Sequence, residues 1–132
     1  MHDYVDVDYE VVSWNPLVMR VVTDDEELTV TGYPVILKVM KVNNKYSVWV
    51  NIIVSTRTNK PRPGPLCTPT MFNARPAGIK EVNVVKDGSL TLRLSTEGTM
   101  SIIIKPTNIS VYPDYRDQFG SPCIMLNWTA FW

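Results

Sequence analysis

Three carboxylates near the start of the chain have the types and spacing that acid–base catalysis requires. Asp6, Asp8 and Glu10 alternate with apolar residues. On an extended strand, side chains two residues apart lie on one face, about 6.6 Å apart. Carboxyl pairs separated by about 5–9.5 Å hydrolyse glycosidic bonds. The same pattern is typical of a solvated strand face whose charges discourage edge pairing, and we favour that interpretation. A carboxylate-dependent hydrolase is therefore the third functional hypothesis.

The residues that bind metals or act as nucleophiles are scarce. The chain has one histidine, His2, and two cysteines, Cys67 and Cys123. A structural zinc site needs four nitrogen or sulfur ligands, and nucleophilic catalysis needs a positioned base. Glycine-rich phosphate loops and nucleophile-elbow motifs are absent from the sequence. We therefore expect no enzymatic activity, no metal, no cofactor and no small-molecule substrate. The sequence leaves open whether the two cysteines form a disulfide.

The charges are divided unequally along the chain. Residues 1–30 carry eight acidic residues and one base, whereas Thr31–Lys80 carries eight bases and no acid; the net charge of the whole chain is zero. The basic stretch is a candidate contact surface for a partner, unless the acidic strands neutralise it in the fold. The candidate nucleic-acid or partner-binding residues are Lys38, Lys41, Lys45, Tyr46, Trp49, Arg57, Lys60, Arg62 and Arg75.

The basic stretch opens with a predicted β-hairpin. Two apolar segments flank Asn43-Asn44, and asparagine tolerates the positive φ of a two-residue type I′ turn. This turn predicts one apolar and one mixed face. The apolar face pairs Val39 with Val48, Leu37 with Val50 and Val35 with Ile52; the mixed face pairs Met40 with Ser47, Lys38 with Trp49, Ile36 with Asn51 and Lys41 with Tyr46.

A long loop follows the hairpin. Residues 56–77 show no periodicity and contain five of the ten prolines. Loops of this length are usually functional or disordered. We expect a partly docked and partly mobile arm in polyproline-like conformation. Two other polar segments are interpreted more simply: Asp24–Glu27 as a solvated acidic turn, and Asp114–Asp117 as a loop with a local ion pair.

The remaining segments are predicted to be short strands. Residues 4–14 alternate as one half-buried strand, residues 17–22 form a second strand, and residues 28–33 form a third that ends at Pro34. Residues 79–105 form a three-strand meander whose turns contain Gly88 and Gly98. Three-residue turns would pair Val84 with Leu90, Val82 with Leu92, Glu81 with Arg93, Asn83 with Thr91, Leu94 with Met100, Leu92 with Ile102 and Leu90 with Ile104. Pro106 ends the last strand of the meander, Asn108–Tyr112 forms a further short strand, and Cys123–Trp132 forms the final strand.

These elements predict a single all-β domain over residues 1–132. Eight or nine short strands with a turn about every ten residues are typical of an antiparallel β-sandwich, which we expect to be jelly-roll-like. The alternative is an OB-like barrel of about five strands, with the N-terminal strands as an extension.

The sequence supports two binding hypotheses. The first is a non-enzymatic assembly or interaction module that contacts protein subunits through the basic hairpin and the proline-rich arm. We expect these subunits to be copies of the chain itself, in a homo-oligomer that belongs to a virion or surface structure. The alternative partner is single-stranded nucleic acid, which positive grooves with aromatic platforms bind. We see no signal peptide and no transmembrane segment, so we expect no membrane partner and, by default, an intracellular or virion location.

Overall fold

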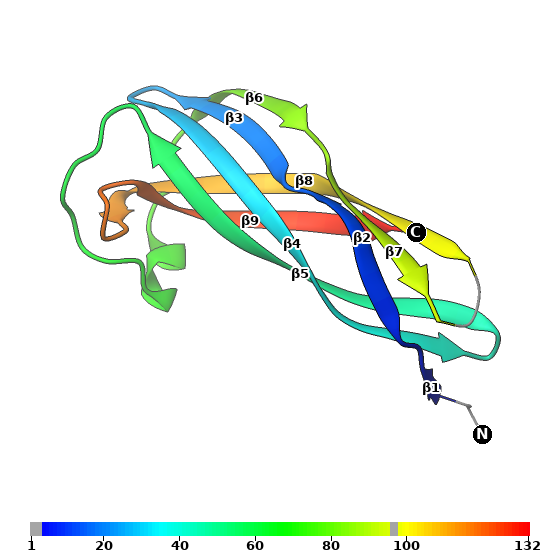
Figure 1. Ribbon diagram of the computed structural model, residues 1–132. Helices are drawn as coiled ribbons and strands as arrows, with labels where there is room; N and C mark the ends of the chain where they lie inside the picture. The colour runs from blue at the N-terminus through cyan, green and yellow to red at the C-terminus, as the bar shows by residue number, and fades with distance from the viewer. Residues whose placement is uncertain (1–3, 96–97) are drawn as a thin grey trace.

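The chain folds into two antiparallel β-sheets that pack face to face. In the computed structural model, residues 4–95 and 98–132 are described (Figure 1). The first sheet contains β1 (Tyr4–Asp6), β3 (Leu17–Thr23), β4 (Glu27–Val42), β5 (Lys45–Thr58) and β6 (Ile79–Lys86). The second sheet has the order β2 (Tyr9–Asn15), β7 (Gly88–Leu94), β8 (Thr99–Arg116) and β9 (Pro122–Phe131). The predicted sandwich is confirmed.

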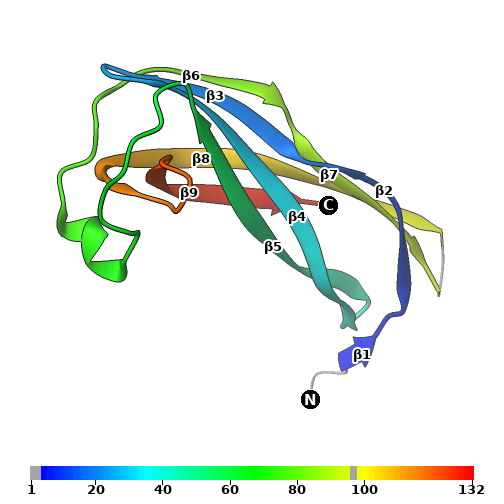
Figure 2. The same cartoon turned by 60° about the vertical axis from the view of Figure 1, so that its left-hand side comes forward.

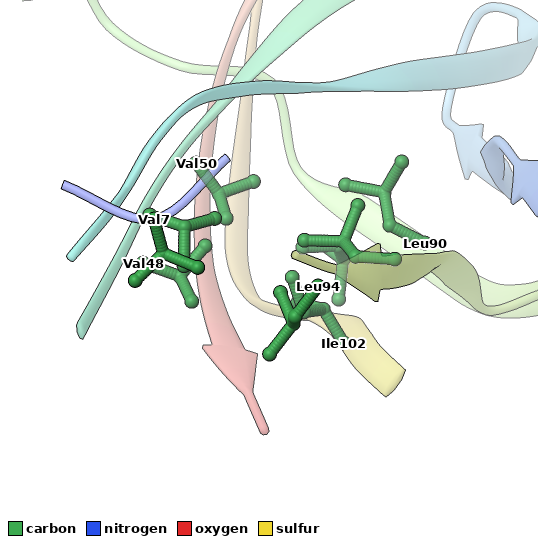
Figure 3. Packing of buried hydrophobic residues seen from close by; sticks show 9 residues of the cluster. Val7, Val48, Val50, Leu90, Leu94 and Ile102 are labelled. Carbon is green, nitrogen blue, oxygen red and sulfur yellow. The ribbon is translucent and has the colours of Figure 1, made fainter. Parts of the chain in front are cut away.

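The hydrophobic core lies between the two sheets. Leu17, Met19 and Val21 of β3 are buried, and the residues between them are more exposed, as period two requires. One core cluster joins Val39, Val48 and Val50 of the first sheet to leucines of β7 and isoleucines of β8 (Figure 3). Full burial of each such side chain contributes about 1.5–3 kcal/mol, so this interface is the main source of stability.

The two sheets are continuous along one side of the sandwich. Only Pro16 separates β2 from β3, and only Asp87 separates β6 from β7. Because β3 pairs with β6 and β2 pairs with β7, these four strands form one long ribbon that passes from sheet to sheet (Figure 2). Gly88 lies at the bend, where a Cβ atom would be 3.1 Å from Cβ of Ile104. The close approach explains the glycine there.

One side of β4 pairs with β3 near its start and with β1 near its end. Between these two pairings, β2 and Val7 supply the hydrogen-bond donors. The indole of Trp14 donates to the Pro34 carbonyl at 2.9 Å, and the Tyr9 hydroxyl donates to the Ile36 carbonyl at 3.3 Å. The Val7 amide donates to the Val39 carbonyl at 2.9 Å. Carbonyl groups of β4 that no strand pairs with are thus satisfied by side chains of β2 and by the amide of Val7, which precedes β2.

The prediction of one strand over residues 4–14 is wrong. The segment divides into β1 and β2, which belong to different sheets, and the buried Val7 lies between them. Asp6 therefore pairs with Lys38 at 3.4 Å, whereas Glu10 pairs with Arg93 at 3.1 Å. The carboxylates do not share one strand face, and two of them have basic partners.

The two prolines that were expected to end strands lie inside longer ones. Pro34 is within β4, and its carbonyl faces Trp14. In a strand, the N–H and the C=O of one residue face the same side. An N–H group at position 34 would therefore face Trp14 and not a paired strand, so its absence in proline costs no ladder hydrogen bond. Pro106 lies within β8, beyond the last residue that pairs with β7 and beside a bulge against β9. Both positions tolerate proline because neither needs a ladder donor.

The predicted meander is wrong for its first pair of strands. β6 pairs with β3 and does not pair with β7. Accordingly, Glu81 lies 3.8 Å from Arg20, and Arg93 pairs with Glu10. β7 and β8 do pair, but Leu92 lies opposite Met100, two residues from the predicted register. A shift of two keeps the apolar face inward. The turn residues 96–97 lie outside the described part of the chain.

The other predicted pairs of the meander shift in the same way. Leu90 lies opposite Ile102 and Gly88 opposite Ile104, while Thr91 lies opposite Ser13 of β2 on its other side.

The helical content of the described residues is one short 3₁₀ turn, η1 (Pro69–Asn73). None of the helical residues described forms a segment long and apolar enough to span a membrane.

Candidate interaction surface

The tip of the β4–β5 hairpin forms as the sequence predicts. Asn43 and Asn44 have φ values of 51° and 66°, which are the left-handed angles of a type I′ turn. Val39 lies opposite Val48, Met40 opposite Ser47, and Lys38 opposite Trp49. The ammonium group of Lys41 lies 5.4 Å from the centre of the Tyr46 ring, within the range of a cation–π contact.

A bulge changes the register farther from the tip. The shift falls between Ile36 and Lys38, so Leu37 is the additional residue on β4. Val50 consequently lies opposite Ile36, Asn51 opposite Val35, and Ile52 opposite Pro34. The predicted pairs of Leu37 with Val50, Val35 with Ile52 and Ile36 with Asn51 are therefore wrong. Val50 remains buried, because the extra residue is accommodated on β4 and leaves the alternation of β5 intact.

The outer face of this hairpin carries several exposed apolar side chains. We call Tyr33, Leu37, Lys38, Trp49 and Ile53 the hairpin face. Trp49 is 63% exposed and Ile53 is 61% exposed. Tyr33 lies opposite Ile53 and stacks on Trp14, with ring centroids 5.8 Å apart. Exposed aromatic and aliphatic side chains grouped on one sheet face are typical of a contact surface.

The predicted basic residues do not form one patch. Lys38 of the hairpin is paired with Asp6, whose side chain is 71% exposed, and Lys45 near the turn is exposed. Arg57 lies twelve residues farther along β5, or about 40 Å at about 3.3 Å per residue. There it lines a shallow hollow with Arg20 and Glu27. Acidic residues are thus interspersed with the bases of the first sheet.

The proline-rich loop lies at the other end of the sandwich and is docked against it (Figure 1). β5 extends to Thr58, so the loop begins later than predicted. Cys67 forms a disulfide with the buried Cys123, which answers the question that the sequence left open. The Arg62 amide donates to the Gly120 carbonyl, and the Arg116 amide donates to the Pro65 carbonyl. Lys60 and Arg75 are exposed on this loop. The structure therefore separates Lys60, Arg62 and Arg75 from the hairpin tip.

The loop is docked around a buried ion pair that the sequence did not reveal. Arg116 and Glu26 are 1% and 5% exposed. The guanidinium donates to both carboxylate oxygens, at 2.9 and 2.7 Å, and the Thr58 hydroxyl donates to Oε1 at 2.6 Å. The guanidinium also donates to the Pro113 carbonyl at 2.9 Å. The sequence places Glu26 in a solvated turn and Arg116 in a loop with a local ion pair, and the structure shows that both interpretations are wrong.

These contacts set the ionisation of Glu26. Burial by itself would raise the pKa of this carboxyl group. The hydrogen bonds from Arg116 and Thr58, together with the positive charges of Arg116 and Arg62, outweigh burial and lower the pKa below its ordinary value of 4.5. Glu26 is therefore held ionised by its partners, and its geometry is that of a structural ion pair, not of an acid–base catalyst.

A groove runs beside the far end of β5. It has a volume of about 390 Å³ and is lined by Val54 and Thr56 of β5, by the Cys67–Cys123 disulfide and by Phe119. Phe119 is 78% exposed and Val54 is 37% exposed.

Among the residues that the structure describes, no group of three or more histidine, cysteine or acidic side chains could hold a metal ion.

Comparisons with known proteins give no further guide to function. No family model, no curated protein and no solved structure matches the chain. The function must therefore be argued from the surface itself.

Proposed function

We propose that the protein is a non-enzymatic interaction module that contacts protein subunits through the hairpin face. The observation that carries this proposal is the exposure of Trp49 and Ile53, both more than half exposed on one strand face. Tryptophan, tyrosine and arginine dominate the binding energy of protein interfaces. The face combines an exposed tryptophan with neighbouring aliphatic side chains, which is the composition of an interface core.

The charges of the face favour a protein partner over a polyanion. Lys38, the base of the hairpin face, lies beside Trp49 and is paired with Asp6, so its charge is offset by a neighbouring carboxylate. Polyanion binding draws its affinity from unpaired basic groups that displace counterions. An apolar centre with paired charges at its margin gains more from burial against another protein.

Sedimentation velocity over a concentration series tests this proposal. We expect the wild-type protein to self-associate as its concentration rises. The Trp49→Ser and Ile53→Ser variants should reduce the association constant at least about tenfold, as loss of an interface anchor does. Val85→Ser on β6 is the matched control, because Val85 is 66% exposed and lies outside the hairpin face. A monomer at every concentration, or equal losses in all three variants, would contradict the proposal.

Single-stranded nucleic acid is the second candidate, favoured by the exposed Trp49 ring beside Lys38 and by the Lys41–Tyr46 contact. Base stacking on such rings is worth about 1–3 kcal/mol per base. A labelled oligonucleotide should then bind at low salt, dissociate steeply as salt rises, and bind at least about fivefold more weakly to Trp49→Ala. Absence of binding at low salt would exclude this candidate.

A further inference from the structure

β5 is an edge strand with an open hydrogen-bonding side. Among the residues that the structure describes, it pairs with β4 alone, so alternate residues turn their backbone groups away from β4. Two contacts identify these residues. The Tyr46 carbonyl accepts from the Trp132 indole at 3.2 Å, and the Ile52 amide donates to the Asn51 side chain at 2.8 Å. Neither partner is a backbone group of β4, so the backbone groups of the even-numbered residues of β5 face away from β4.

The residues of this edge are nearly symmetric about Asn51. Moving outward from Asn51 in the two directions, the paired positions hold valine and isoleucine, then tryptophan and isoleucine, then two valines, then two serines. The segment is Ser47-Val-Trp-Val-Asn-Ile-Ile-Val-Ser55. A strand that pairs with its own copy in antiparallel orientation, about a two-fold axis at Asn51, places these positions opposite each other.

We propose that two copies of the chain associate by antiparallel pairing of their β5 edges, with the two-fold axis at Asn51. This inference rests on the proposed function and adds the identity of the partner and the register of the contact. The axis puts Val50 opposite Ile52 of the second copy, and Val48 opposite its Val54. All four are even-numbered, so each pair can exchange two backbone hydrogen bonds, as the antiparallel ladder requires.

The side chains select this register over its neighbours. With the axis at Asn51, Trp49 lies opposite Ile53 of the second copy in a non-hydrogen-bonded pair, where side chains approach most closely. Aromatic residues opposite β-branched residues are among the stabilising cross-strand pairs. A shift of two residues in either direction would place Trp49 opposite Asn51 or Ser55. The two most exposed apolar side chains of β5 are therefore both covered only in the Asn51 register.

The opposite edge of the same sheet is less suited to self-pairing. β6 also has a central Val-Asn-Val sequence, at residues 82–84. Symmetric pairing about Asn83 would place Glu81 opposite Val85 and Lys80 opposite Lys86. Register shifts also interrupt the pairing of β6 with β3 near both ends. Charges within three residues of the axis, together with these irregularities, oppose edge association of β6, whereas the first charges of β5 lie six residues from Asn51. β6 therefore provides a control of the same residue type.

The dimer should be weak and should strengthen with salt. Edge pairing covers the exposed parts of a few side chains on each copy, which places it at the small end of protein interfaces. Asn51 must also release the Ile52 amide when the strands pair. Lys45 would lie opposite Arg57 of the second copy, and screening of this like-charge pair favours association. This salt dependence is opposite in sign to that of nucleic-acid binding.

Cysteine cross-linking at the axis tests the pairing. In an Asn51→Cys variant, the two introduced thiols would face each other in a non-hydrogen-bonded pair, where Cα atoms are about 4.5 Å apart. Mild oxidation should give a covalent dimer that peptide mapping assigns to residue 51. Asn83→Cys on β6 is the matched control and should stay uncross-linked. Ser47→Cys and Ser55→Cys should each fail alone but cross-link when the two variants are mixed.

Wild-type sedimentation under the same conditions separates the two proposals. If the wild type associates but Asn51→Cys does not cross-link above Asn83→Cys, the edge pairing is overturned while the proposed interaction module stands. Cross-linking of Ser47→Cys alone, or of Asn83→Cys, would overturn the register. If the wild type stays monomeric, the proposed function itself is contradicted and the pairing falls with it.

Discussion

The Arg116 guanidinium donates two hydrogen bonds to the Glu26 carboxylate. The two residues are ninety positions apart in the sequence, and both side chains are almost fully buried. Glu26 lies in the turn between β3 and β4, and Arg116 is the last residue of β8. The aliphatic part of Arg116 packs on Gly64, where a Cβ atom would be 2.9 Å from its Cγ. The pair therefore fastens three segments at one end of the sandwich.

Removing one member of this pair should be strongly destabilising. In Arg116→Met, the Glu26 charge stays buried without its partner, and loss of one member of a buried pair costs about 3–5 kcal/mol. Arg93→Met, which breaks the exposed pair with Glu10, should cost about 0–1 kcal/mol. Urea denaturation measures both. The double variant Arg116→Met with Glu26→Gln should recover part of the loss; equal losses in Arg116→Met and Arg93→Met would contradict the assignment.

The lowered pKa of Glu26 predicts a loss of stability in acid. Since the folded-state pKa lies below the unfolded value of about 4.5, the unfolded chain binds the proton first as the pH falls. The stabilisation is fully present above the unfolded pKa and is lost as the pH falls through the folded pKa. The urea midpoint should therefore fall more steeply below about pH 5 in the wild type than in Glu26→Gln, because that variant lacks the titrating group. Parallel pH profiles for the two proteins would contradict this.

The Cys67–Cys123 disulfide should contribute substantially to stability. It closes a loop of 56 residues, for which the chain-entropy model gives about 4 kcal/mol. Reduction should lower the free energy of unfolding by about this amount, and a Cys67→Ser, Cys123→Ser double variant should match the reduced wild type. The reductant should leave the double variant unchanged, which controls for other effects. Equal urea midpoints for oxidised and reduced wild type would exclude a stabilising role.

Alanine substitutions at two glycines should distinguish the cost of backbone strain from the cost of a steric clash. Both Gly98 and Gly120 have positive φ, at 53° and 85°. A Cβ atom at Gly98 would meet nothing within 4 Å, whereas at Gly120 it would be 2.9 Å from the Arg62 amide nitrogen. Gly98→Ala should therefore cost about 1–2 kcal/mol, and Gly120→Ala at least about 2 kcal/mol more, because the loop must also move. Thermal denaturation of both variants measures these losses of stability. Equal losses would contradict the prediction, because they would show that the loop moves away from the added methyl group without a measurable loss of stability.

The sequence predicts those parts of the fold that depend on local geometry. Alternation and the Asn43-Asn44 turn are local signals, so the sandwich class and the hairpin tip were predicted correctly. Partners of strands are set by long-range packing, so nothing within residues 79–94 indicated that β6 and β7 belong to different sheets. The sequence predicts that Pro34 and Pro106 end strands, but both lie inside strands. A strand accepts proline where no neighbouring strand needs its N–H, and the local sequence does not show which neighbours are present.

The candidate surface was predicted in composition but not in arrangement. Lys38, Tyr46 and Trp49 were correctly placed on one hairpin, since a two-residue turn determines their spacing. The bases of the loop were grouped with them only because they follow in sequence, and the disulfide holds that loop at the other end. Glu26 could not be distinguished from the acidic residues beside it, because burial arises from segments ninety residues away.

The ribbon that runs from β2–β3 into β6–β7 has a mechanical consequence. On that side the two sheets share continuous backbone at Pro16 and Asp87, so chain connectivity fixes their relative position there in addition to apolar packing. On the opposite side, no strand pairing joins β5 to β9 within the part of the chain that the structure describes. There the Trp132 indole donates to the Tyr46 carbonyl of β5, and the Cys67–Cys123 disulfide ties the loop after β5 to β9. Separation of the two sheets is therefore opposed by the backbone on one side, and by a hydrogen bond and a covalent cross-link on the other.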